Sequence, residues 1–183
     1  MPRSGIGERA GELVRLREEL QRTYAARDGS EKADRAWAVA AERLGVATKA
    51  FYAPFTGLGR AIRAGERDAI DSAVRFLEAD PWCFRSGYLK AELMSALANA
   101  PLRDDDKRRL HGIVMNRLKH REPRLLRPTG RLAANVWDDD LAREIDRLLI
   151  DGTEAERADA DAVRHAVEHK RRSIAGAASS RDE

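Results

Sequence analysis

One segment near the end of the chain carries residue types that could hold a zinc ion. His165 and His169 lie four residues apart, about one helical turn, and Glu168 stands between them. This order matches the inverted zinc-protease motif, in which two histidines bind the metal and the glutamate acts as general base. Proteins with that motif supply a third ligand well downstream, whereas fourteen residues follow His169. We interpret the segment as a charged surface helix and expect neither a metal site nor a cofactor.

Two runs of three aspartates are further candidates for binding a divalent cation. Asp104–Asp106 and Asp138–Asp140 each open a predicted helix. Carboxylates in the first turn complement the helix dipole and accept hydrogen bonds from its free amides. Neither run has the alternating spacing and the glycine of a calcium-binding loop. Both runs are therefore interpreted as helix caps.

The remaining candidates for chemistry are a glycine-containing loop and a cysteine. Thr56-Gly57-Leu58-Gly59 has two glycines of a phosphate-binding loop, but no predicted strand precedes it, so we expect a turn with positive backbone angles. Cys83 stands between Trp82 and Phe84, which is typical of a small buried hydrophobic residue. The tryptophans are likewise interpreted as packing residues; they are Trp37, Trp82 and Trp137.

Positive charge is concentrated between Arg103 and Arg131. This segment holds ten basic and four acidic residues, although the whole chain has a net charge of only +3. One face of it could contact an acidic protein or a phosphate backbone. The alternative is a solvated face with salt bridges between helices. The predicted binding residues are Arg117, Lys119, Arg121, Arg124, Arg127 and Arg131.

Composition limits the remaining possibilities. A single cysteine excludes an internal disulfide framework and fits a reducing compartment, so we expect a cytoplasmic protein. The longest uncharged stretch, 50–59, is too short to span a bilayer, and no membrane partner is expected. No pattern points to a small-molecule site.

The elements that must position these residues are all predicted to be helices. Apolar residues recur every three or four positions, and no window alternates with a period of two, so we predict an all-α fold of about eight or nine helices. Ser30, Asp138 and Thr153 are predicted N-caps, and Pro128 with Gly130 should kink or interrupt the helix that follows Pro123. The breaks between helices are marked by Asp28-Gly29, Pro54, Gly65, Asp80-Pro81, Pro101, Pro123 and Asp151-Gly152.

The passage Ala73–Leu97 resembles a repeat of the HEAT/armadillo type. It reads as an apolar helix, the turn Asp80-Pro81, then Phe84-Arg85 at the start of a second apolar helix. The resemblance implies that Pro81 sets the turn and that Arg85 ties neighbouring repeats together. Residues 65–77 with Asp80-Pro81 are also similar to the second helix of a tetratricopeptide repeat, which is the rival interpretation. Either family implies stacked antiparallel helix pairs with one extended binding surface.

These observations predict one helical domain over residues 1–175, with a helix pair at 1–53, a HEAT-like α-solenoid stack at 54–175 and a disordered tail at 176–183. The predicted function is a non-enzymatic interaction or adaptor module for an acidic protein partner. The alternative is a HEAT-like nucleic-acid-binding protein, such as one related to DNA repair, that uses the 103–131 segment. HEAT-like DNA glycosylases grip DNA in this way, but Trp137 beside Asp138 is the nearest approach here to their catalytic arrangement.

Overall fold

The structure is a computed structural model that describes the backbone of residues 3–179 and the side chains of residues 5–173. These residues form nine α-helices and two short 3₁₀ helices without a β-strand, which confirms the all-α prediction. The solenoid arrangement stays a prediction. The α-helices are α1 Arg3–Ala25, α2 Glu31–Tyr52, α3 Leu58–Arg63, α4 Arg67–Ala79, α5 Ser86–Leu97, α6 Asp104–His120, α7 Leu126–Val136, α8 Asp139–Asp151 and α9 Glu154–Ser179. The 3₁₀ helices are η1 Ala53–Phe55 and η2 Pro123–Leu125.

The contacts divide the chain into two compact units. The first contains the residues up to Gly57 together with Ala79–Ser86, and the second contains Leu58–Glu78 and the chain from Gly87 onward. The last helix continues to Ser179, beyond residue 175 where we predicted the domain to end. Residues 176–179 of the predicted disordered tail at 176–183 belong to α9, and the rest of that tail lies outside the described residues.

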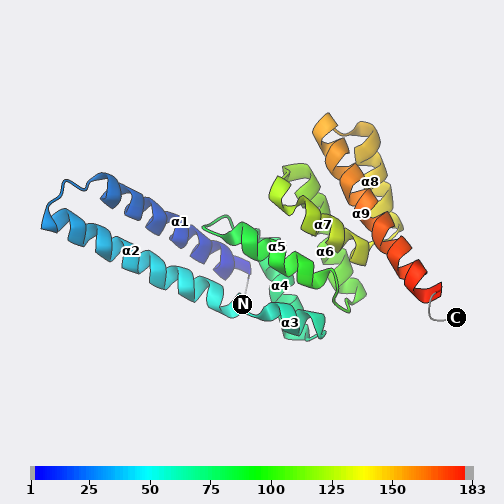
Figure 1. Cartoon of the computed structure of the whole chain (residues 1–183), viewed down its shortest axis with the longest axis horizontal. Coiled ribbons are helices and arrows are strands. Elements are labelled where there is room, and N and C mark those ends of the chain that lie inside the picture. The colour runs from blue at the N-terminus through cyan, green and yellow to red at the C-terminus, as the bar shows by residue number, and fades with distance from the viewer. Residues whose placement is uncertain (1–2, 180–183) are drawn as a thin grey trace. The chain divides into compact units, whose positions relative to one another are not determined.

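The first unit is built on the antiparallel pair α1 and α2, drawn in blue and cyan (Figure 1). Gly29 has a φ of +82° at the turn, and Ser30 caps α2 by accepting a hydrogen bond from the amide of Ala33 at 3.2 Å, as predicted. Leu13 and Leu16 of α1 are buried, but Tyr24 near the end of the same helix is 63% exposed.

A loop between α4 and α5 corrects one prediction. Trp82 is 80% exposed instead of packed, and Cys83 is only half-buried. Two non-glycine residues in this loop, Asp80 with φ +44° and Arg85 with φ +66°, adopt left-handed backbone conformations. Such angles turn the chain sharply, so the segment between them points its aromatic side chains outward.

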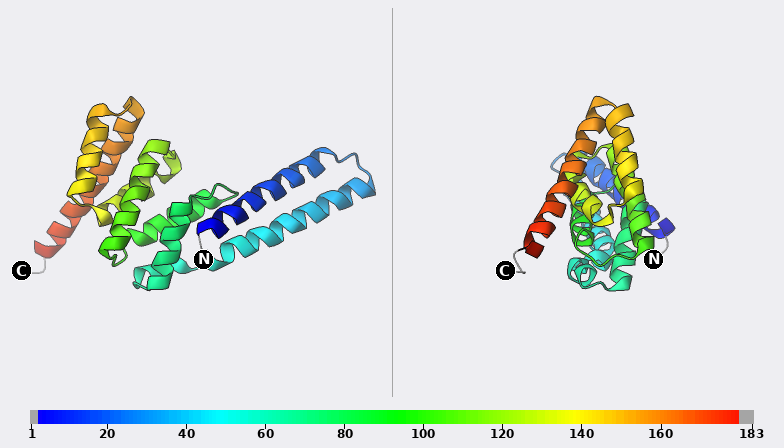
Figure 2. Two further views of the ribbon diagram at one scale, coloured as in Figure 1. Left: turned by 180° about the vertical axis from the view of Figure 1, so that it is seen from behind. Right: turned by 90° about the vertical axis from the view of Figure 1, so that its right-hand side faces the viewer.

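The core of the second unit is formed by buried side chains of α4, α5, α6, α7, α8 and α9. Its fully buried side chains are aliphatic or aromatic, and they include Ile70, Phe76, Leu93, Leu97, Leu110, Val114, Leu132, Ile145 and Val163. Helices α8 and α9 fold back on each other, and α7 packs along α9 (Figure 2). Of the predicted binding residues, Arg127 and Arg131 lie on α7.

Ion pairs join α4 to α6 in this unit. Arg109 donates to both carboxylate oxygens of Glu78, at 2.9 and 2.8 Å, and to Asp71 at 3.0 Å. Arg67 donates to both oxygens of the buried Asp106, at 2.6 and 2.9 Å. Two of the charged residues at the start of the basic segment are thus engaged inside the fold.

Candidate binding groove

The predicted binding residue Arg117 does not lie on the surface. It is 4% exposed and forms an ion pair with Glu122, whose Oε1 also lies 3.8 Å from the ammonium of the buried Lys90. A buried arginine stabilises the fold only while its counter-charges stay in place. Arg117 is therefore corrected to a structural position, and it does not meet the other predicted residues on one surface.

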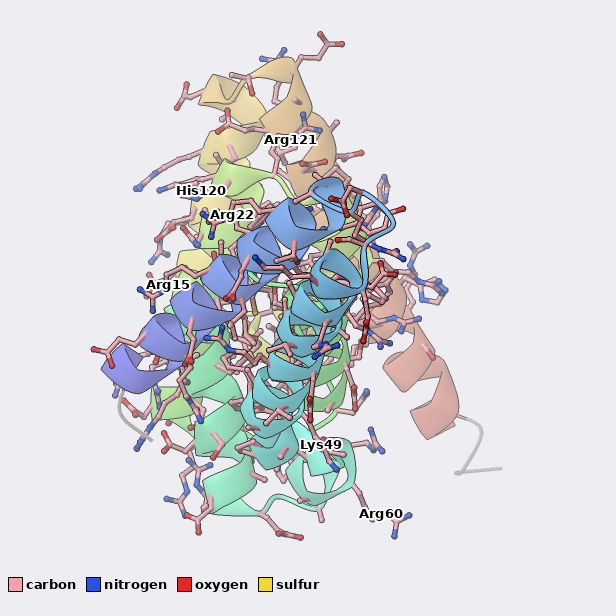
Figure 3. All side chains as sticks on the ribbon, turned by 90° about the vertical axis from the view of Figure 1, so that its left-hand side faces the viewer. Arg15, Arg22, Lys49, Arg60, His120 and Arg121 are labelled. Carbon is pink, nitrogen blue, oxygen red and sulfur yellow. The ribbon has the colours of Figure 1, made fainter. Side chains whose placement is uncertain are left out.

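Arg121 is also engaged within the second unit, at the end of α6. Its backbone has a φ of +39°, and its Nε donates to Oδ2 of Asp159 on α9 at 2.8 Å. The hydrogen bond with Asp159 raises the pKa of Arg121. Figure 3 labels Arg121 beside His120 at this end of the helix. The side chain is partly exposed, but its charge is already matched by a carboxylate.

Four of the predicted residues are exposed cations: Lys119, Arg124, Arg127 and Arg131. No carboxylate of the described residues forms an ion pair with them. Arg127 and Arg131 lie four residues apart on α7, so they share one face of that helix. They are the two members of the predicted set that line a groove.

The groove lies along the contact between α7 and α9, which approach each other closely at Gly130. A Cβ atom at position 130 would lie 2.9 Å from the Cβ of Ala166 and 3.7 Å from the Cα of Val163. Glycine is therefore required here for packing and not for a turn. The groove beside this contact has a volume of about 810 Å³.

Pro128 is compatible with this helix because of where α7 begins. We predicted that Pro128 with Gly130 would kink or interrupt this helix, and that prediction is wrong: η2 ends at Leu125, and α7 starts at Leu126 and includes both residues. Pro128 is then the third residue of α7, in the first turn, where an amide has no carbonyl partner within the helix. The helix runs without a break from Leu126 to Val136, and this places Arg127 and Arg131 on one groove wall.

The charge that lines the groove is positive. Arg127 and Arg131 come from α7, and His169 and Lys170 come from α9; the described residues that line the groove include no aspartate or glutamate. Lys170 donates to the carbonyl of Ala98 at 2.7 Å, and burial lowers the pKa of its ammonium. This absence of carboxylates stands out in a chain with 31 acidic residues.

The floor of the groove is apolar and, apart from Leu126, is made of small residues. It is formed by Leu126, Gly130 and Ala134 of α7 and by Ala162 and Ala166 of α9. Small residues leave room for another chain to approach the helix backbones closely. The surface thus combines an apolar floor with basic sides.

A hydrogen-bond cluster fixes the end of the groove. Asn135 donates to the carbonyls of Leu97 at 2.8 Å and Ala100 at 3.0 Å, beside the bond from Lys170 to Ala98. Leu97 ends α5 and its carbonyl also accepts from the amide of Ala100 at 3.2 Å, while Ala98 and Ala100 follow the helix. The side-chain hydrogen bonds from α7 and α9 tie the two groove helices to the end of α5 and the residues after it.

The aspartate runs act as helix-starting segments, as interpreted from the sequence. Asp138 accepts from the amide of Leu141 at 2.8 Å and caps α8. Asp106 accepts from the amide of Arg103 at 3.0 Å in addition to its bonds with Arg67. The described residues contain no group of three or more metal-ligating side chains placed to share an ion.

The histidine motif lies along the exposed side of α9. His165 Nε2 is 3.6 Å from Asp161 Oδ2, and Glu168 Oε1 is 3.6 Å from Arg164 Nε. His169 instead lines the groove. The sequence predicts a charged surface helix here and gives no sign that His169 and the basic segment line one groove. Lys170 was missed because no local pattern relates it to Arg127, some forty residues earlier.

Cys83 and Tyr52 form a separate polar contact in the first unit. The Tyr52 hydroxyl donates to the carbonyl of Phe84 and lies 3.6 Å from the Cys83 sulfur. Burial, followed by the neighbouring Cys83, raises the pKa of Tyr52. The tyrosine therefore stays protonated and serves as a hydrogen-bond donor that holds the exposed aromatic loop.

None of the described helices is long and apolar enough to cross a membrane. No protein-family model, curated protein sequence or solved structure matches the chain.

Proposed function

We propose that this chain is a non-enzymatic interaction module of the HEAT-like helical-repeat type, which acts in the cytoplasm and binds an acidic protein partner. The observation that supports the proposal best is the groove between α7 and α9, whose sides carry Arg127, Arg131 and Lys170 and no carboxylate among the described lining residues. Charge of one sign in a concave site attracts partners of the opposite sign and disfavours others.

The apolar floor favours a protein partner over nucleic acid. Nucleic acids present phosphates and sugars to most basic surfaces, and these groups gain little from a floor of alanine and leucine. A protein segment can place carboxylates on the basic sides and apolar side chains on the floor. Nucleic-acid binding remains the alternative function that the experiment must separate from this one.

Capture of partners from cell extract, with and without nuclease treatment, tests the proposal. The wild type is compared with the double variant Arg127→Glu/Arg131→Glu. The matched control is Arg143→Glu/Arg147→Glu, which changes the same charge at the same spacing on α8, where neither residue lines the groove. We expect proteins with acidic segments to be lost with the groove variant and kept with the control. An identical set of proteins with all three baits contradicts the proposal, and binding that disappears on nuclease treatment supports the nucleic-acid alternative.

A further inference from the structure

The shape of the groove fits one more helix. Two helices in contact leave a furrow between them, and α7 and α9 approach closely because Gly130 faces Ala166. The floor residues Ala134 and Ala162 project only a methyl group each. An incoming helix can therefore lie close to both, as in the helix-in-groove mode of peptide recognition.

The charges define what this helix must carry. Arg127 and Arg131 stand four residues apart on one side, and neither forms an ion pair with a described residue. His169 and Lys170 stand on the other side, and Ser173 follows His169 by four residues. A helix between the two sides meets cations on both flanks and small apolar side chains beneath.

We infer that the groove receives an acidic amphipathic helix of the partner protein, with an apolar stripe flanked on both sides by carboxylates. The inference rests on the proposed function and specifies the partner segment. Carboxylates four residues apart on the incoming helix match Arg127 and Arg131, since the two spacings are equal. The apolar stripe covers the floor formed by Leu126, Ala134, Ala162 and Ala166.

A synthetic peptide tests the inference directly. The probe is a fluorescent peptide of about 18 residues, long enough to form a helix on binding, with leucines spaced three and four apart and glutamates on both flanks. One comparison peptide has lysine in place of every glutamate, and a second has the same composition in an order that breaks the apolar stripe. Binding to the full chain is followed by fluorescence anisotropy. We expect only the amphipathic glutamate peptide to bind.

Variants then locate the site. Arg127→Glu/Arg131→Glu should weaken binding of the glutamate peptide by roughly tenfold or more, because two favourable charge contacts become repulsive. Ala162→Trp should weaken it similarly by filling the floor, and the exposed position of Ala162 lets the chain fold with the larger side chain. Arg143→Glu/Arg147→Glu should bind within about twofold of the wild type, since rim charges outside a contact contribute little.

The results separate this inference from the proposed function. Three results would overturn the inference. All three peptides could bind equally, or the groove and control variants could lose binding equally. A short DNA duplex could also displace the probe more readily than unlabelled peptide does. If the peptide fails to bind but partner capture still depends on Arg127 and Arg131, the function stands and the helical occupant is wrong. If the peptide binds as expected but capture is independent of these arginines, the groove chemistry stands and the proposed function is wrong.

Discussion

At the residue scale, Asp106 shows how one side chain can serve two purposes. Its carboxylate accepts a hydrogen bond from the amide of Arg103 at the start of α6. It also accepts hydrogen bonds from the two terminal guanidinium nitrogens of Arg67 on α4. The side chain is 1% exposed, whereas that of Arg67 is 36% exposed. The sequence indicated the cap, because an aspartate in the first turn is favourable there. The pairing with Arg67 on α4 could be seen only in the tertiary structure.

Replacing Asp106 tests this double role. Asp106→Ala should lower the free energy of unfolding by about 2–3 kcal/mol, because the cap is lost and the paired charge of Arg67 loses its partner; solvent around Arg67 moderates the cost. Urea denaturation measures the change. The control is Asp105→Ala at an exposed neighbouring position, which should change stability by less than about 0.5 kcal/mol. Equal effects of the two changes would show that Asp106 has no special role.

Acidification tests the same contact by another route. The hydrogen bond with Arg67 lowers the pKa of Asp106 below its usual value of 3.8, so the unfolded state takes up the proton more readily. The contribution is therefore fully present above about pH 4 and is lost as the pH falls through the lowered folded pKa. We expect the stability difference between the wild type and Asp106→Asn to be constant near neutrality and to shrink below about pH 4. Urea titrations over this pH range measure it, and a difference that persists unchanged in strong acid contradicts the assignment.

At the scale of elements, the contact between α7 and α9 depends on the absence of a side chain at position 130. Glycine in mid-helix is less favourable than alanine by about 1 kcal/mol. A glycine at such a position is therefore expected where a neighbouring helix leaves no room for a side chain. The close approach to Ala166 supplies the reason. The sequence indicates only that Gly130 weakens its helix, because no residue near position 130 points to a contact with Ala166 on α9.

Substitutions at glycine separate packing from propensity. Gly130→Val should destabilise the protein by about 2 kcal/mol, because the branched side chain pushes α9 away. Gly112→Ala is the control: it is exposed within α6, a Cβ there meets nothing within 4 Å, and the change should stabilise the protein by about 0.5–1 kcal/mol. Thermal and urea denaturation measure both. The exchange Gly130→Ala/Ala166→Gly should recover stability lost in Gly130→Ala, and failure to do so would place the strain elsewhere.

At the scale of the whole molecule, the net charge hides a strong local imbalance. The Arg103–Arg131 segment has an excess of six positive charges, which leaves the rest of the chain at −3. Folding then distributes that excess: Arg109, Arg117 and Arg121 pair with carboxylates, and Arg127 and Arg131 remain at the groove. The surface available to a partner is smaller and better defined than the sequence segment suggested.

Salt dependence tests whether this imbalance governs binding. Raising the salt concentration from about 0.1 M to about 1 M shortens the screening length from about 10 Å to about 3 Å. Binding of the glutamate peptide should weaken by roughly tenfold, while circular dichroism stays unchanged because the core is apolar. Fluorescence anisotropy at the two concentrations measures it. Binding that strengthens with salt would show that the apolar floor alone drives the contact.

The local features of this protein could be predicted from its amino-acid sequence. The all-α class, Ser30 and Asp138 as caps, the capping box of Thr153 with Glu156, and the breaks at Asp28-Gly29 and Asp80 all follow from interactions within a few residues, and the structure confirms them. The tertiary structure decided which charges are available and which residues face one another. Arg117 is buried, Trp82 is exposed, and Lys170 comes beside Arg127, because burial and pairing depend on helices distant in the chain.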